Sequence, residues 1–93
     1  MKPRIGRKVY CIYDDGIFMD TAGYIGKDSF IVESVLDGTN EDSWRWFYDH
    51  YGVNWFTSLC KAKEELLRHF ENCTGRKYKV VKVTDDWWQL EER

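Results

Sequence analysis

A dense run of aromatic residues in the middle of the chain constrains the fold more than any other feature. Seven of the thirteen residues from position 44 to position 56 carry aromatic rings: Trp44, Trp46, Phe47, Tyr48, Tyr51, Trp55 and Phe56. The 93 residues form a single domain, residues 1–93, because domains commonly contain about 100–150 residues. A segment with this many rings in so small a domain must either join two packed layers or present some rings to a partner.

Alternation of apolar and polar residues predicts an antiparallel meander in the first third of the chain. The expected strands are residues 9–13, 17–25 and 29–35. The turns between them fall at residues 14–16 (Asp-Asp-Gly) and 26–28 (Gly-Lys-Asp), because these residue types suit tight turns. Gly23 marks a bulge or a close backbone approach in the second strand.

Residues 43–49 predict a fourth strand, with Trp44, Trp46 and Tyr48 on one face. A short helix is the alternative for this segment, because no glycine or proline interrupts it.

The segment after the aromatic run predicts the one helix of the fold. Apolar residues recur at spacings of three and four, which forms a single apolar stripe. The stripe consists of Leu59, Ala62, Leu66 and Phe70. Thr57 or Ser58 is the expected N-cap, and Gly75 suits a left-handed C-terminal cap.

The C-terminal segment predicts a hairpin over residues 78–83 and 87–90, with a turn at residues 84–86. The resulting order ββββαββ indicates a small α+β fold. We expect a strongly bent, SH3-like antiparallel sheet of about five to six strands with one helix packed on it. The predicted core consists of Val9, Cys11, Phe30, Val32, Leu59, Ala62, Leu66, Phe70, Val81 and Val83.

Two stretches resemble known proteins. The opening "IGRKVY…GYIGKDSFIVESV" looks like the first strands of small SH3-like barrels. Together with "YGVNWFTSLCKAKEELL", it resembles short uncharacterised proteins of bacteriophages and Firmicutes, in which a barrel-like meander leads into a "WFTs…A" helix start. The resemblance covers about two-thirds of the chain; Cys60 departs from it, because such proteins often carry a polar residue there. It implies an accessory protein of a mobile element that binds a host factor such as a defence complex.

Catalysis and metal binding lack a converging set of residues. The pair His69 and Cys73 is spaced i,i+4 on the predicted helix, but zinc sites usually add a second close pair of ligands. The adjacent acids at positions 14–15 and 85–86 fall in predicted turns, and turn chemistry explains them better than acid–base catalysis. We therefore expect no metal, no cofactor and no enzymatic activity.

The charge pattern and the tryptophans favour protein binding. Residues 9–56 carry a net charge of −7, and residues 85–93 a net charge of −3. Tryptophan and tyrosine are enriched at binding hot spots, and acidic surfaces attract cationic partners. The expected partner is a host protein or complex with a basic surface. In an anti-CRISPR-like version, the protein blocks the basic site of a nucleic-acid-binding machine. The candidate contact residues are Asp42, Trp44, Trp46, Tyr48, Asp49, Asp85, Asp86, Trp87 and Trp88.

Nucleic-acid binding through the basic C-terminal half is the alternative, since small barrels often bind RNA or DNA. Its candidate residues are Arg76, Lys77, Lys79 and Lys82. The sequence pI near 5.6 argues against this alternative, because nucleic-acid-binding domains are usually basic. Homodimerisation through the aromatic rings of the candidate protein-contact residues is a third alternative.

The cellular location follows from the cysteines and from the absence of long apolar runs. Cys11, Cys60 and Cys73 include no CxxC pair, which favours reduced thiols in a cytosolic protein. No apolar run approaches the roughly 20 residues of a membrane span, and the first ten residues lack the apolar stretch of a signal peptide. We therefore expect a cytoplasmic protein without membrane contact.

Overall fold

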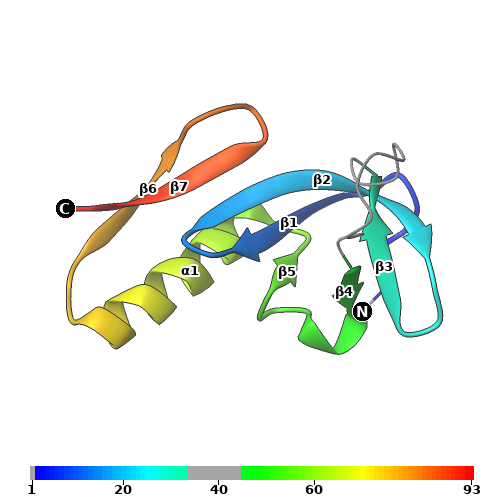
Figure 1. Ribbon diagram of the computed structural model, residues 1–93, viewed down its shortest axis with the longest axis horizontal. Coiled ribbons are helices and arrows are strands. Elements are labelled where there is room, and N and C mark those ends of the chain that lie inside the picture. The colour runs from blue at the N-terminus through cyan, green and yellow to red at the C-terminus, as the bar shows by residue number, and fades with distance from the viewer. Residues whose placement is uncertain (1, 34–44) are drawn as a thin grey trace.

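The computed structural model describes residues 2–33 and 45–93. These residues form one helix packed on a strongly curled antiparallel sheet (Figure 1), which confirms the predicted small α+β class. In this part of the chain, no helix has the length and apolar character to cross a membrane. The elements are β1 (Lys8–Tyr13), β2 (Gly16–Ile25), β3 (Ser29–Val32), β4 (Arg45–Phe47), a 3₁₀ helix (Tyr48–His50), β5 (Trp55–Phe56), α1 (Leu59–Thr74), β6 (Tyr78–Lys82) and β7 (Trp87–Glu92).

The ten-residue strand β2 organises the sheet. One of its edges pairs with β1 from Lys8↔Thr21 to Tyr13↔Gly16. Its other edge pairs first with β7, over residues 16–18, and then with β3, over residues 22–25. The register shifts between Ala22 and Tyr24, so the bulge expected at Gly23 is present where one partner strand gives way to the other. Figure 1 shows β2 running from the β6–β7 hairpin and α1 at one end to β3 and β4 at the other.

The two faces of the β1–β2 hairpin carry separate cores, because successive side chains of a strand point to opposite faces. The sheet core, inside the curl, consists of Val9, Cys11, Ala22, Phe30, Val32 and Trp55. The helix core, under α1, consists of Ile17, Phe56, Ala62, Leu66, Trp88 and Leu90.

Adjacent aromatic residues in β5 connect the two cores. Trp55 is completely buried in the sheet core, and its indole Nε1 donates a hydrogen bond of 2.8 Å to the Phe47 carbonyl oxygen. Its ring meets the Phe30 ring edge-on, with 4.9 Å between the centroids. Phe56 is buried in the helix core. The aromatic run therefore joins two packed layers, which was one of the two outcomes expected for it.

Helix α1 begins and ends where the sequence predicts. Ser58 is the N-cap, and its hydroxyl accepts a hydrogen bond from the Lys61 N–H. Gly75 is the C-cap in the left-handed conformation, with φ of 71°. Ala62 and Leu66 are buried against the sheet, so the apolar stripe faces the core as expected.

Three expectations about strands need correction. Strand β5 was not predicted, because two residues are too few to show an alternating pattern. The segment expected as one strand over residues 43–49 is the short β4 followed by the 3₁₀ helix; its first two positions lie outside the described residues, as do positions 34 and 35. Val83 was assigned to the core but is 59% exposed.

The misplaced Val83 reflects the orientation of the C-terminal hairpin. Val80 is paired with Leu90, and both side chains belong to the helix-core side. Val81 and Val83 therefore point to the opposite face, because a shift of one residue reverses the face of a strand. The large side chains of β7 decide which face of the C-terminal hairpin is buried.

We predict that Trp55→Phe lowers the free energy of unfolding by about 2 kcal/mol, because it removes a buried hydrogen bond and part of a buried side chain. Urea denaturation followed by circular dichroism measures this change. The matched control Phe47→Leu alters a ring that is 43% exposed and should change stability by less than about 0.5 kcal/mol. Equal effects of the two substitutions would contradict the role assigned to Trp55.

Candidate functional site

An apolar row crosses β1, β2 and β7 on the sheet face opposite to α1 and ends at Val83, which follows β6. Trp87 of β7 is paired with Phe18 of β2, and Phe18 is paired with Cys11 of β1. On the outer side of the row, the Val83 N–H donates a hydrogen bond of 2.9 Å to the Trp87 carbonyl oxygen. Side chains of directly paired residues share a face, so Trp87 and Phe18 lie side by side. Val83 follows the last β6–β7 pair, Lys82↔Trp88, and continues that register beside Trp87.

The indole of Trp87 lies across Gly16. A Cβ atom at position 16 would be 2.2 Å from Cζ2 of Trp87, so the ring occupies the space that any larger residue would fill. The indole Nε1 donates a hydrogen bond of 3.1 Å to Oε1 of Gln89. Because Gly16 has no side chain, the half-buried Trp87 ring can lie against the backbone of β2.

Trp46 extends this row from a distant part of the sequence. Its ring packs against the Phe18 ring, with 5.9 Å between the centroids. Its Nε1 is buried and has no hydrogen-bond partner among the described residues. We call the set Phe18, Trp46, Val83 and Trp87 the aromatic face.

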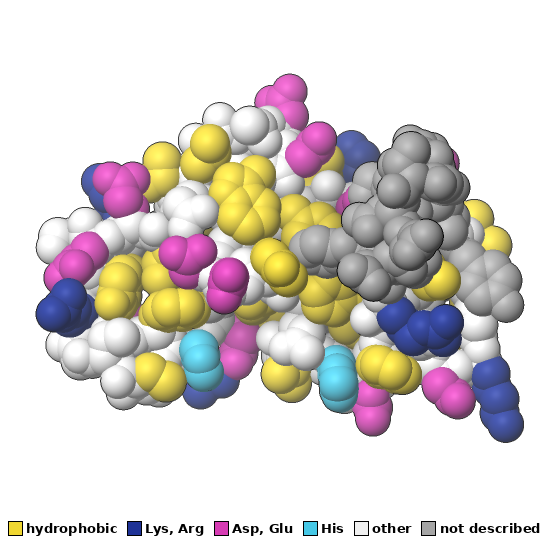
Figure 2. All heavy atoms as spheres, in the orientation of Figure 1, with side chains coloured by type: hydrophobic (Ala, Val, Ile, Leu, Met, Phe, Trp, Pro, Cys, Tyr) yellow, Lys and Arg dark blue, Asp and Glu magenta, His cyan; other side chains and the backbone are white. Residues whose placement is uncertain are grey.

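Carboxylates surround the aromatic face. They come from the β1–β2 turn, from β2 itself and from the β6–β7 turn: Asp14, Asp15, Asp20, Asp85 and Asp86. Figure 2 shows a hydrophobic area over β2 and β7 with acidic side chains along its upper and left-hand edges. This part of the surface therefore combines apolar contact area with negative potential.

Backbone hydrogen bonds hold both acidic turns against the sheet. The Asp15 carbonyl oxygen accepts hydrogen bonds from the Leu90 N–H at 2.9 Å and from Nε2 of Gln89 at 3.2 Å. The Asp86 carbonyl oxygen accepts one from the Met19 N–H at 2.7 Å. The backbone of both acidic turns is consequently fixed beside the strands that carry Trp87 and Phe18.

A buried thiol lies beneath this surface. Burial raises the pKa of the Cys11 thiol, and the negative charge of Asp20 raises it further. Cys11 therefore remains a neutral thiol that packs like a small apolar side chain, whereas Cys60 and Cys73 are exposed.

The structure brings together four of the predicted contact residues: Trp46, Asp85, Asp86 and Trp87. Trp88 is a correction, because it is only 6% exposed and belongs to the helix core. Neighbours on a strand point to opposite faces, so Trp87 and Trp88 cannot both reach one surface. Asp42 and Trp44 lie outside the described residues.

Tyr48 and Asp49 lie at the β2–β3 turn rather than beside Trp87. The Tyr48 hydroxyl donates a hydrogen bond of 3.0 Å to the Gly26 carbonyl oxygen, and its ring stacks on Phe30. Burial raises the pKa of Tyr48, and the Asp28 carboxylate adds to the shift. The Asp49 carboxylate is exposed and lies 3.7 Å from the His50 ring.

The predicted nucleic-acid residues are exposed but partly neutralised by acids. Arg76 pairs with Glu92 at 3.3 Å, and Lys82 pairs with Asp85 at 3.5 Å. Lys79 stands directly opposite Glu91 in the β6–β7 ladder. Lys77, the fourth residue, is exposed. Acids thus lie beside or opposite three of the four cations.

Phe18, Val83 and Gly16 were missed as contributors to the site. Phe18 looks like any apolar strand residue, and Gly16 looks like a turn glycine. Only the pairing of β2 with β7, two segments about seventy positions apart, shows that they lie beside Trp87. No local signal in the sequence could have identified them.

Metal-binding side chains do not cluster in the described ranges 2–33 and 45–93: no group of three or more His, Cys, Asp or Glu residues could hold an ion there. The predicted helix pair is adjacent, with Cys73 Sγ 4.0 Å from His69 Nε2, but both groups are on an exposed part of α1.

No protein-family model, curated protein or solved structure matches the chain.

The contact between Gly16 and Trp87 predicts strong coupling between these positions. Gly16→Ala should displace the indole, shift the tryptophan emission and destabilise the protein by about 1 kcal/mol. In a Trp87→Ala background, Gly16→Ala should be neutral or stabilising by up to about 1 kcal/mol, because alanine is favoured over glycine within a strand. A double-mutant cycle by urea denaturation measures the coupling, and additive effects would contradict the packing described.

The burial of Cys11 predicts selective thiol chemistry. An aromatic disulfide reagent should titrate Cys60 and Cys73 in the native protein within minutes and Cys11 only after addition of urea, because reaction requires an accessible thiolate. Absorbance of the released thiol measures both phases. The variant Cys11→Ala should remove only the urea-dependent phase; rapid reaction of all thiols in the native state would contradict the burial of Cys11.

Proposed function

We propose that the protein is a non-catalytic interaction domain that binds a basic surface of a partner protein through the aromatic face and its surrounding carboxylates. The observation that carries this proposal is the position of the Trp87 indole, which lies across Gly16 beside Phe18 with acidic turns on two sides. A tryptophan held in this way at a surface is typical of a binding hot spot.

The charges around Trp87 favour a cationic partner. Asp14, Asp15 and Asp86 are exposed and form no ion pair within the described residues. Asp85 is paired with Lys82 at 3.5 Å, but its side chain is 96% exposed, so solvent screens that pair strongly. A lysine- or arginine-rich surface would complement this rim and would approach it faster than a neutral one.

The concrete version of this proposal is an inhibitor from a phage or another mobile element. An acidic surface competes with phosphates for the same lysines and arginines, so such a protein would obstruct a host defence complex or another nucleic-acid-binding machine. The three free cysteines support a site of action inside the cell, where thiols stay reduced.

We favour protein binding over nucleic-acid binding because of the ion pairs in the basic C-terminal half. Arg76 and Lys82 lie beside Glu92 and Asp85; these exposed ion pairs are weak, but the acids lower the positive potential that a phosphate backbone would meet. The Trp87 ring lies beside two acidic turns, whose carboxylates repel a phosphate backbone.

A synthetic peptide tests the proposal. The probe has about twelve residues in which arginine alternates with leucine, which is long enough when extended to span the 38 Å long axis of the protein. We expect Trp87→Ala to weaken its binding about 30-fold and Asp86→Lys to weaken it about tenfold. Isothermal titration calorimetry at about 50 and 300 mM salt measures both effects and their screening.

Asp49→Lys is the matched control, because it changes the net charge as Asp86→Lys does but lies at the β2–β3 turn. It should weaken binding less than about twofold. The wild-type protein, but not Trp87→Ala, should also release the peptide from a labelled DNA duplex. Equal effects of Asp49→Lys and Asp86→Lys would overturn the proposed face.

Two further results would also overturn the proposal. One is salt-sensitive binding of duplex DNA or RNA that is lost in Lys77→Glu and Lys79→Glu, which would establish the nucleic-acid alternative. The other is a dimer, observed by light scattering, that dissociates in Trp87→Ala, since a second copy of the chain would then occupy the face.

A further inference from the structure

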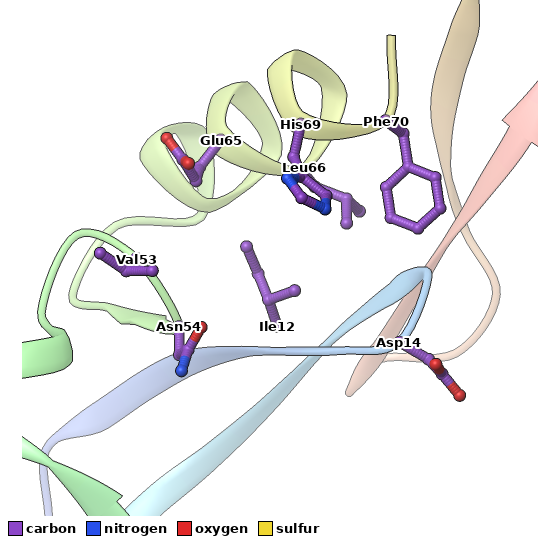
Figure 3. A pocket seen from close by; sticks show the side chains of 8 residues that line it. All are labelled: Ile12, Asp14, Val53, Asn54, Glu65, Leu66, His69 and Phe70. Carbon is purple, nitrogen blue, oxygen red and sulfur yellow. The ribbon is translucent and has the colours of Figure 1, made fainter. Parts of the chain in front are cut away.

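A cavity opens on the other side of the β1–β2 turn from Trp87. It lies between the end of β1, the loop before β5 and helix α1, and its volume is about 350 Å³. Figure 3 shows Ile12, Val53 and Leu66 around the space, with His69 and Phe70 above it on α1. Known ligand pockets span about 300–1,000 Å³, so the cavity is large enough for a side chain or a small ligand.

Three apolar side chains, which we call the floor of the cavity, line it from both sides: Ile12 from β1, and Leu66 and Phe70 from α1. Leu66 is only 1% exposed. The His69 and Phe70 rings meet edge-on, with 5.6 Å between the centroids. Such a floor suits an aromatic or aliphatic group, because burying apolar surface drives binding.

The edge of the cavity is acidic. Asp14 lies at one side in the turn, and Figure 3 shows its carboxylate pointing away from the apolar floor. Glu65 lies at the other side and forms an ion pair with Arg68. Because Asp14 forms no ion pair within residues 2–33 and 45–93, the edge favours a cation and disfavours an anion.

The cavity and the aromatic face meet at one turn. Asp14 borders the cavity, Asp15 is hydrogen-bonded to β7 through Leu90 and Gln89, and Gly16 lies beneath the Trp87 indole. A partner segment that covers Trp87 has to cross only these residues to reach the cavity. Figure 2 shows acidic side chains between the hydrophobic area and the left-hand of the two histidine side chains (cyan) below it.

We propose that this cavity is a second anchor point for the same basic partner and that it binds an apolar side chain whose sequence neighbour is cationic. The apolar group occupies the floor formed by Ile12, Leu66 and Phe70, and the neighbouring cation pairs with Asp14 at the edge. This inference rests on the proposed function, and it adds the type of residue that the partner must present.

A capped tripeptide, acetyl-Arg-Phe-Arg-amide, tests the chemistry of the cavity independently of Trp87, because it is too short to cover both places. We expect a dissociation constant on the order of 1 mM. Amide chemical-shift changes in a ¹H–¹⁵N spectrum should centre on Ile12, Asn54 and His69. Replacing phenylalanine by alanine, or both arginines by glutamate, should abolish the changes.

Two protein variants test the assigned contacts. Asp14→Asn removes the charge but suits the left-handed backbone at this position, where φ is 57°, and it should weaken tripeptide binding about fivefold. Val53→Phe places a larger group at the cavity mouth and should weaken it at least about fivefold. Asp49→Asn is the matched control and should leave it unchanged. Equal binding of the glutamate tripeptide, or no effect of either variant, would overturn the inference.

The arginine–leucine peptide connects the two sites and separates their failures. If both sites bind one segment, Val53→Phe, which alters the cavity and not the aromatic face, also weakens this longer peptide. If the longer peptide depends on Trp87 but not on Val53→Phe, the second anchor is wrong and the proposed function stands. If the tripeptide binds the cavity but Trp87→Ala does not weaken binding of the longer peptide, the proposed function fails. The second anchor then fails with it.

Discussion

The pairing of one edge of β2 with two different strands is the constraint on which the rest of the structure depends. Residues 16–18 pair with β7 and residues 22–25 pair with β3, so the strand must bend and the sheet must curl. The bend separates the two faces of the β1–β2 hairpin into an enclosed side and a helix-covered side. A domain this small obtains two cores from one hairpin, and the adjacent Trp55 and Phe56 rings hold those cores together.

The same pairing creates the candidate site. Because β7 is paired with β2, Trp87 stands opposite Phe18, and Trp46 reaches Phe18 from the far side. Because strand neighbours alternate, Trp88 goes under the helix and stabilises the fold. One tryptophan of the pair thus serves stability and the other remains available at the surface. The turns of the β1–β2 and β6–β7 hairpins both lie beside the Trp87 ring, and this brings their acidic residues to the edge of the aromatic face.

The accuracy of the sequence-based expectations differs between local and non-local features. The limits of α1, its caps and the bulge near Gly23 follow from residues close together in the chain, and the structure confirms them. The turn expected at residues 14–16 is also present, although Gly16 is already paired in β2. The buried face of β6 was assigned wrongly, because Tyr78 and Val80 on one face and Val81 and Val83 on the other are equally apolar. Strand β5 was overlooked because its two residues form a strand only through pairing with β1.

The sequence by itself determined the fold class, the position of the helix and the acidic character of the central segment, since composition, periodicity and turn residues act over a few positions. Only the tertiary structure decided that Trp87 faces outward beside Phe18 and Trp46, that Trp88 is buried, and that Tyr48 and Asp49 lie elsewhere. The physical reason is that strand pairing joins residues tens of positions apart, and its register, which fixes the face of every side chain, is chosen by packing of the whole domain.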